Sequence, residues 1–371
     1  MHSERAAGQL RKRQAREGRR RLWIKRAAIA AVCLVALLVV PAGLFIGFRC
    51  YSRQATETTQ GSRDESSTYL TLPEWYIVYS TEEYASFIGR EAPSRFPYFR
   101  SVGQYWSYYG GVCDATKGRY RFNPGTHLML GVIGVSFSIE DGVKGVYEST
   151  IGRLTEWLAS HDTEEDAFAA RTATEYGRFM HTIPWYEFPF GAKIAALWGE
   201  TSLWDSHLIR KWERKAALTL EYGLKAIYGR VIGGGTHTVY APEELEIQAW
   251  VEDAPDSIFA DPAVRKVIER GPHSYTVMVP RYEAFTVTAL SLIGSGARFR
   301  DIAGNDEILI TAIAPLAFDG TLPEGSLLFH RPILTMPGFE RVAVLAPVGS
   351  LHAVVRHLRE RDVRIEHLYD Y

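Results

Sequence analysis

Residues 276–302 read TVMVPRYEAFTVTALSLIGSGARFRDI, and residues 342–368 read VAVLAPVGSLHAVVRHLRERDVRIEHL. Each stretch begins with a strand-like run that ends in a proline, at Pro280 and at Pro347. An amphipathic helix and a second strand-like run follow in both stretches. The proline precedes the closing run by 17 residues in the first stretch and by 16 in the second. The sequence therefore predicts two βαβ units in tandem.

Two tandem βαβ units are the plan of a ferredoxin-like sandwich. Between them, residues 304–306 form a turn into EILITAI, and GSLLFHRPIL follows, which predicts an inserted β-hairpin. We therefore predict a ferredoxin-like α/β domain with an inserted hairpin over residues 236–371. Chance similarity between two generic units is the alternative. That fold serves regulators, sensors, assembly modules and enzymes, so it does not indicate an activity.

The preceding region, residues 69–235, is predicted to be a mainly helical domain, so the whole chain belongs to the α+β class. Three residue pairs resemble helix starts, and the last helix extends from about residue 204 to 232. Gly233, Gly234 and Gly235 should then break the chain at the domain boundary. The predicted starts are Ser80 with Glu83, Asn123 with Pro124, and Thr163 with Asp166.

Two of these helices carry an apolar stripe at helical spacing, which we expect to face a core. Residues 128–137 of the earlier helix are apolar on every side, which predicts deep burial or partial insertion in a bilayer. The stripe of that helix is Leu128, Val132, Val135, Ile139, Val143, Val146, Leu154 and Trp157, and that of the last helix is Ile209, Trp212, Ala216, Leu220, Leu224, Ile227 and Val231.

An uncharged run covers residues 27–48. At about 1.5 Å per residue it is long enough to span a bilayer core. It is longer than the apolar core of a typical signal peptide, so we predict a single, uncleaved transmembrane helix. The polar stretch at residues 49–68 reads as a flexible tether.

The net charge of −1 hides an asymmetry. Residues 1–26 carry ten Lys or Arg against Glu4 and Glu17, a balance of +8, which leaves −9 for the rest of the chain. A basic arm can bind nucleic acid, but one that adjoins an apolar span is read as a topology signal. We therefore predict a cytoplasmic N-terminus, the inner membrane as location, an extracytoplasmic bulk and no nucleic-acid partner.

Three cysteines do not make a disulfide framework, and no pair has metal-ligand spacing. The sequence leaves undecided whether Cys50 and Cys113 form a disulfide, which requires that both lie outside the cytoplasm. The histidines show no metal-binding spacing, and no nucleotide-binding, zinc-protease or nucleophile motif occurs. The sequence therefore predicts neither metal nor cofactor, and it leaves catalytic residues unknown.

Aromatic side chains crowd around Pro184 and Pro189. One interpretation is a loop that folds onto its own core. The other is a surface that contacts lipid headgroups or a hydrophobic ligand. The residues in question are Trp185, Tyr186, Phe188 and Phe190.

Two charged residues fall on the apolar stripes. On a helical wheel Arg153 lies at the angle of Val135, and Glu213 lies beside Ala216. An isolated charge does not stay ionised in an apolar core. Each therefore reaches solvent near a helix end, pairs with unrelated groups, or pairs with the other across the two helices.

These features lead to two hypotheses of function. The first is a membrane-tethered binding or assembly protein without catalysis, with a protein partner or a homo-oligomer left open. The second is an enzyme or carrier that acts on a lipid or other hydrophobic ligand near the membrane. A closed apolar pocket would favour the second, and an exposed apolar patch above roughly 400 Å² would favour the first.

Overall fold

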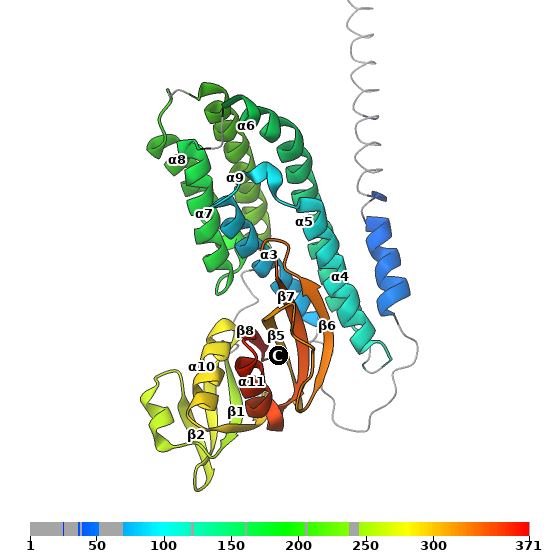
Figure 1. Ribbon diagram of the computed structural model, residues 1–371, viewed down its shortest axis with the longest axis vertical. Coiled ribbons are helices and arrows are strands. Elements are labelled where there is room, and N and C mark those ends of the chain that lie inside the picture. Colours follow the sequence, from blue (N-terminus) through cyan, green and yellow to red (C-terminus); the bar gives the residue numbers. More distant parts are fainter. Residues whose placement is uncertain are drawn as a thin grey trace, which may run out of the picture.

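The structure is a computed structural model, and it describes residues 25, 36–37, 39–51, 70–118, 120, 122–159, 162–204, 207–236 and 245–370. Helices make up most of the described residues between 72 and 236, and strands with two further α-helices make up most of residues 246–369. This confirms the mixed helical and sheet composition. The two parts lie end to end, and α3 and α4 extend from the helical part to one of the sheets (Figure 1).

The helical region comprises α3 to α9, joined by short turns of 3-10 or π geometry. The α-helices are α3 Leu72–Ile88, α4 Tyr98–Thr116, α5 Pro124–Tyr147, α6 Arg153–Ala159, α7 Glu164–Met180, α8 Phe190–Glu200 and α9 Leu208–Thr236, and the turns are η2 Pro93–Arg95, η3 Glu148–Gly152 and η4 Trp185–Glu187.

Two of the three predicted helix starts are confirmed by their caps. The side chain of Asn123 accepts hydrogen bonds from the backbone N–H groups of Gly125 and Thr126 at the start of α5. The hydroxyl of Thr163 accepts one from the N–H of Asp166 at the start of α7. Both side chains satisfy donors that have no partner within the helix.

The third predicted start and the glycine break are wrong. Helix α3 begins at Leu72, and the hydroxyl of Ser80, inside the helix, donates to the carbonyl of Ile77. Residues 233–235 continue α9 to Thr236 instead of ending it. The end of α9 packs closely on the η4 turn, because a Cβ on Gly229 would lie 2.9 Å from the carbonyl oxygen of Tyr186. Small residues there allow the close approach.

The C-terminal part repeats one βββαβ unit. Its two four-stranded antiparallel sheets have the orders β2-β3-β1-β4 and β6-β7-β5-β8, so the strand numbers differ by four throughout. This matching order confirms the tandem repeat. The elements are β1 Glu246–Glu252, β2 Arg265–Gly271, β3 Ser274–Pro280, α10 Tyr282–Gly294, β4 Arg298–Ile302, β5 Glu307–Pro315, β6 Ser326–Pro332, β7 Phe339–Pro347, α11 Leu351–Glu360 and β8 Arg364–Tyr369.

The ferredoxin-like arrangement is wrong, because that fold places both βαβ units in one sheet. Here each unit forms its own sheet, with β1 between β3 and β4 and with β5 between β7 and β8. The inserted hairpin is also wrong, since β6 pairs with β7 and not with β5. The first strand of each unit, β1 or β5, lies between the two strands of its βαβ stretch, which the repeat alone does not reveal.

Both units contribute to one apolar core around α10 and α11. Phe285 of α10 and Leu351 of α11 are buried there with Val277, Ile310 and Val344 from three strands. Strands β5 and β7 are buried on both faces. Leu309 of β5 lies on the other face of the sheet from Ile310 and belongs to a second core with residues of α3 and α4. Burial on both faces explains why these strands are continuous apolar runs.

The end of the N-terminal segment, from Phe45 to Cys50, lies against α4. Residues 39–45 are helical and continue into the π-turn η1, Ile46–Cys50. The rings of Phe45 and Trp106 meet with centroids 5.3 Å apart. A disulfide joins Cys50 to Cys113 of α4, so the bridge that the sequence left open is present.

The predicted transmembrane helix at residues 27–48 lies only partly within the described residues. The basic tail, residues 1–26, and the tether, residues 49–68, lie almost wholly outside them. Across the described ranges, no helix combines the length and the apolar character needed to cross a membrane.

Candidate functional site

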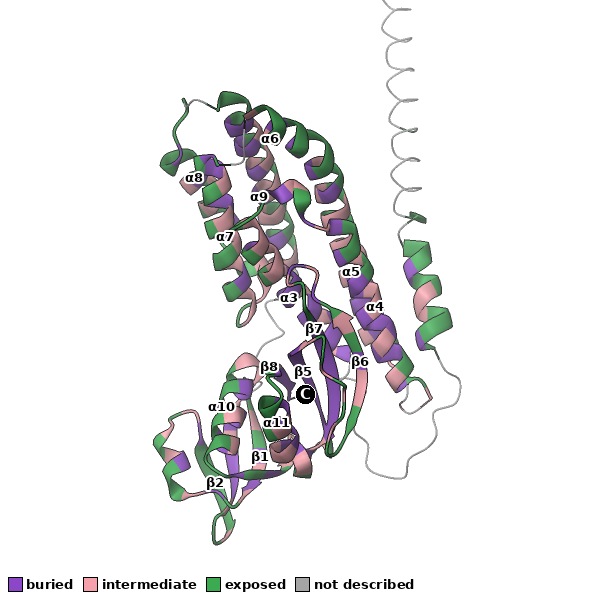
Figure 2. Cartoon of the chain, viewed as in Figure 1, coloured by how far each residue is buried: buried purple, intermediate pink, exposed green. Residues whose placement is uncertain are grey.

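The apolar stripes of α5, α6 and α9 face away from the protein, so their expected burial is wrong. Val143 is 67% exposed, Leu224 60% and Trp157 81%. Exposed residues follow the outer sides of α5 and α6 in Figure 2. The exposed members are Leu128, Val132, Ile139, Val143, Val146, Leu154 and Trp157 with Ile209, Trp212, Leu220, Leu224, Ile227 and Val231, and we call them the outer stripes.

The inner side of α9 is charged instead. The side chains of Arg210, Lys211, Arg214 and Lys215 are at most 2% exposed. At 100° per residue they lie opposite the outer stripe of the same helix. A buried charge costs several kcal/mol unless it is paired. The inside of this region must therefore supply carboxylates.

Acidic residues from four helical elements, η3, α6, α7 and α9, meet the two arginines. Arg214 lies 2.6 Å from the Glu148 carboxylate and 3.3 Å from that of Asp166. Arg210 lies 2.8 Å from Asp166 and 3.1 Å from Glu213. The contacts with Asp166 and Glu148 tie α7 and η3 to α9.

The two buried lysines of α9, Lys211 and Lys215, share one carboxylate, that of Glu165. The ammonium groups of Lys211 and Lys215 lie 3.1 and 3.4 Å from the fully buried Glu165 carboxylate. Lys215 also donates to the carbonyl oxygens of Thr201 and Ser202, each 3.2 Å away. These partners compensate for much of the loss of hydration.

The π-turn η3 places Glu148 inside this network. A Cβ on Gly152 would overlap the Glu148 carboxylate, so only glycine leaves room for it. One carboxylate oxygen of Glu148 is buried without a hydrogen-bond partner among the described residues, and so is the hydroxyl of Tyr98. Single π-turns inside α-helices are frequent at functional sites.

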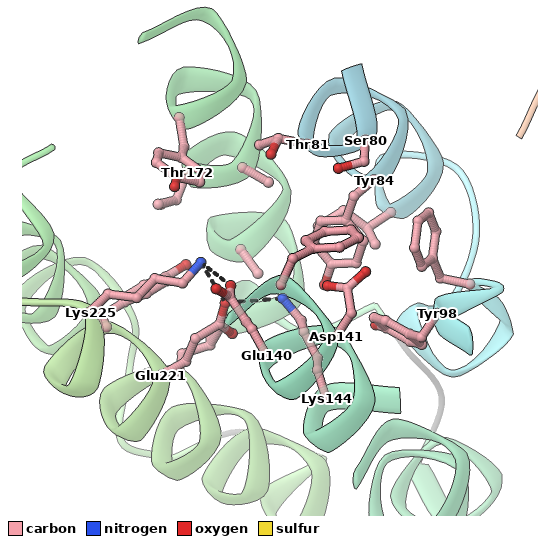
Figure 3. Close-up of a pocket in the computed structure, with 18 of the residues that line it drawn as sticks. Ser80, Thr81, Tyr84, Tyr98, Glu140, Asp141, Lys144, Thr172, Glu221 and Lys225 are labelled. Atoms are coloured by element: carbon pink, nitrogen blue, oxygen red, sulfur yellow. Dashed lines mark hydrogen bonds and ion pairs between the residues drawn. The ribbon is translucent and has the colours of Figure 1, made fainter. Parts of the chain in front are cut away.

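A cavity of about 90 Å³, lined by apolar and polar side chains, lies between α3, α5, α7 and α9 (Figure 3). The carboxylate of Glu140 at its edge is half exposed, so the cavity reaches the surface there. Its polar lining is Ser80, Thr81, Tyr84, Tyr98, Glu140, Asp141, Lys144, Thr172, Tyr176, Glu221, Tyr222 and Lys225.

The two lysines of the cavity are paired. The Lys144 ammonium lies 3.0 Å from the Glu221 carboxylate. That of Lys225 lies 2.6 Å from Glu140 and 3.5 Å from Glu221. A third carboxyl, that of Asp141, points into the cavity on the side of Tyr98 in Figure 3.

Burial raises the pKa of Asp141 to about 7. The neighbouring Glu140 acts in the same direction, whereas Lys144, Lys225 and the Ser101 hydroxyl oppose it. A carboxyl with such a pKa exchanges its proton near neutral pH, which makes the cavity a candidate site.

The four aromatic residues of the 185–190 loop divide into two pairs. Phe188 and Phe190 are buried in a small core with Tyr176. Trp185 and Tyr186 are half-buried. The Trp185 ring packs on a residue of α9, Tyr228, at 5.2 Å between centroids. The loop therefore lies on the helical region, and Phe190 also lines the cavity.

No ion pair joins Arg153 to Glu213 among the described residues, although Glu213 contacts Thr155 of the same helix as Arg153. Arg153 is exposed, whereas the Glu213 side chain is only 8% exposed. Glu213 accepts a 2.5 Å hydrogen bond from Tyr147 and a 3.0 Å bond from Thr155, in addition to its ion pair with Arg210.

Cys50, Cys113 and His127 place three ligand atoms within 4.8 Å of one another. The two sulfurs form the disulfide, and metals bind cysteine as the thiolate. His127 is held by a 2.8 Å hydrogen bond between its Nδ1 and Tyr109. In this oxidised state the group is not a metal centre.

Reasoning from periodicity missed the buried cations because it assigned the apolar stripe to the core. One signal was available, since Arg210, Lys211, Arg214 and Lys215 recur at a spacing of four opposite that stripe. The cavity carboxyl Asp141 gave no comparable signal, because charged residues commonly end an apolar run.

Comparisons with protein-family models, curated proteins and solved structures found no significant match to this chain.

Proposed function

We propose that the protein is a membrane-bound binding or assembly protein without catalysis, whose outer stripes lie against the hydrocarbon of a bilayer. One observation carries this proposal. The large aliphatic side chains of α5, α6 and α9 are exposed, while four basic side chains of α9, those of Arg210, Lys211, Arg214 and Lys215, are buried. A soluble helical domain has the opposite distribution.

Energetics support a lipid environment for the stripes. Apolar surface in water costs about 25 cal/mol per Å², and soluble monomers rarely expose a patch above a few hundred Å². Lipid hydrocarbon would remove this cost. The sequestered ion pairs fit the same environment, because ionisable groups within membranes face the protein interior and pair there.

Tryptophan placement gives a second argument. Trp157 at the end of α6, Trp204 before α9 and Trp212 early in α9 are 81%, 76% and 41% exposed. The ends of α6 and α8 lie near the start of α9 in Figure 1. Tryptophan prefers the boundary between headgroups and hydrocarbon. The proposal therefore places this end of the helical region at that boundary.

The proposed location is the inner membrane, with a cytoplasmic N-terminus and the bulk of the chain outside the cytoplasm. The basic run before residue 27 supports this orientation. The Cys50–Cys113 disulfide supports it as well, because such bonds persist in oxidising compartments.

The cavity favours this role over transport of a lipid. Its volume of about 90 Å³ is well below the roughly 300 Å³ at which ordinary ligand pockets begin. Its lining also carries three carboxyl and two ammonium groups, which do not suit an acyl chain.

Depth-dependent quenching tests the bilayer contact. Leu224 and Leu316 are both 60% exposed, but Leu316 belongs to the β-sheet part. In a Cys33→Ala background, Leu224→Cys and Leu316→Cys are each labelled with an environment-sensitive fluorophore, and the full chain is placed in vesicles. A lipid-borne quencher should act on the label at 224, and an aqueous quencher on the label at 316.

Two outcomes would contradict the proposal. Quenching of the label at 224 by the aqueous reagent would show a stripe in water. Protection of that label from both reagents would show that another protein surface, such as a second copy of the chain, covers the stripe.

A further inference from the structure

The cavity of the helical region is lined by three carboxyl groups but only two ammonium groups. Lys144 and Lys225 are each within 3.0 Å of a carboxylate, that of Glu221 or Glu140. Asp141 takes part in no ion pair among the described residues. Once Asp141 is ionised, the cavity lacks one positive charge.

Aromatic rings form much of the cavity wall and already accept positive charge. The ammonium of Lys144 lies 4.1 Å from the ring centroid of Tyr84, and that of Lys225 lies 5.0 Å from that of Tyr176. Ring faces attract ammonium ions through their quadrupole, more strongly where water is excluded. The aromatic lining is Tyr84, Phe96, Tyr98, Phe137, Tyr176, Phe190 and Tyr222.

Size and hydrogen bonding limit what fits. At about 90 Å³ the cavity is much smaller than the roughly 300 Å³ of an ordinary ligand pocket, so it suits a ligand of few heavy atoms. The Tyr98 hydroxyl has no hydrogen-bond partner of good geometry among the described residues. Burial and the nearby Tyr84 raise its pKa, so the hydroxyl stays protonated. Its oxygen is free to accept a hydrogen bond.

We propose that this cavity binds a small protonated amine, whose N–H groups donate to Asp141 and Tyr98 and whose carbon atoms pack on the aromatic wall. This gives a ligand class to the proposed binding role and rests on that role, but it does not require bilayer contact. The half-exposed Glu140 carboxylate at the edge provides an attractive entrance for a cation.

Binding should release a proton at slightly acid pH. The ammonium ion favours ionised Asp141, whose carboxyl is protonated below about pH 7 in the free protein. Affinity therefore rises as pH rises toward 8. The other titratable groups facing the cavity are Glu140 and Lys144 of α5, Glu221, Tyr222 and Lys225 of α9, Tyr84 of α3, Tyr98 of α4 and Tyr176 of α7.

Most of these groups keep one state between pH 6 and 8. Burial raises the pKa of the four tyrosines above its ordinary value, so they stay neutral. Although burial raises the pKa of Glu221, Lys144 and Lys225 lower it to about 2.

Calorimetric titration of the full chain in detergent with ethylammonium chloride tests the inference. Saturable binding is expected, with net proton release at pH 6 shown by buffers of different ionisation enthalpy. Asp141→Asn should weaken binding at least tenfold and abolish the release. Tyr98→Phe should weaken it severalfold. The control Asp319→Asn alters an exposed carboxylate of the β-sheet part and should bind like the wild type.

Three results would overturn the inference. They are no saturable binding by the wild type, unchanged binding by a folded Asp141→Asn variant, and equal competition by potassium chloride. If Asp141→Asn does not fold, two other results test the inference. Unchanged binding by Tyr98→Phe together with no proton release by the wild type at pH 6 would overturn it. Because detergent replaces the bilayer, failure here is distinct from failure of the membrane contact, which the quenching experiment measures.

Discussion

Helices α9 and α11 both carry an apolar stripe, yet they turn it in opposite directions. In α11, Leu351 and Leu358 are fully buried against the sheets, and Arg356 is exposed. In α9, Leu224 is 60% exposed and Arg214 is 1% exposed. Periodicity identifies a stripe but not its direction, because the direction depends on what the neighbouring helices offer. Around α9 they offer carboxylates.

The same contrast holds for whole regions. The β-sheet part buries aliphatic and aromatic side chains around α10 and α11, and most of its ion pairs lie at the surface, as in Arg361 with Asp319. The exception is Arg341 of β7, which is buried where it pairs with Glu83 and Glu366. The helical region buries ion pairs and exposes aliphatic side chains. The first is held together mainly by the hydrophobic effect, and the second depends strongly on paired charges.

Removing one buried cation should give the largest effect. Arg214→Met leaves the buried carboxylate of Glu148 without its ion-pair partner and removes one of the two arginines that contact Asp166. Breaking a buried ion pair from one side costs about 3–5 kcal/mol. Denaturant unfolding of the full chain in detergent should show this loss. The control Arg361→Met, at an exposed ion pair, should barely change the denaturant midpoint. Equal changes for both variants would mean that the buried ion pairs contribute no more to stability than exposed ones.

Leucine-to-alanine substitutions compare the two stripes directly. Leu351→Ala opens a cavity in the β-sheet core and should cost about 2–5 kcal/mol. Leu224→Ala removes the same atoms from an outer stripe and should stay within about 0.5 kcal/mol in detergent. Thermal unfolding of the two variants measures the difference. A large loss for Leu224→Ala would show that the stripe packs against protein.

The π-turn offers the finest test. Gly152→Ala would force the Glu148 carboxylate to move and should cost about 1–3 kcal/mol, as overpacking does. Gly142→Ala lies one helix earlier, where a Cβ meets nothing within 4 Å. It should stabilise the protein by up to about 1 kcal/mol through helix propensity. Unfolding midpoints that move in the same direction for both variants would contradict the crowding at Glu148.

The sequence predicted the local elements better than their assembly. Caps at Asn123 and Thr163 mark real helix starts because a side chain satisfies donors a few residues away. The repeat was visible through Pro280 and Pro347. The order of the strands in each sheet could not be predicted, because the pairing of β1 with β4 depends on long-range contacts that leave no local pattern.

The candidate site was harder still to predict. Asp141 follows an apolar run and reads as its polar end, yet the surrounding helices enclose it. Arg153 and Glu213 share a helical-wheel position with apolar residues, but Arg153 is exposed at the start of α6, whereas the side chain of Glu213 in α9 is buried. Local sequence cannot distinguish these cases because burial depends on how the helices cross.

The Cys50–Cys113 bond closes a covalent ring, since 63 positions separate its two cysteines. A single proteolytic cut between residues 51 and 70 opens that ring without dividing the molecule. The fragment that begins the chain stays attached to α4 through sulfur. Shedding of the folded part from its N-terminal segment by such a cut therefore requires two separate chemical events, peptide hydrolysis and thiol–disulfide exchange.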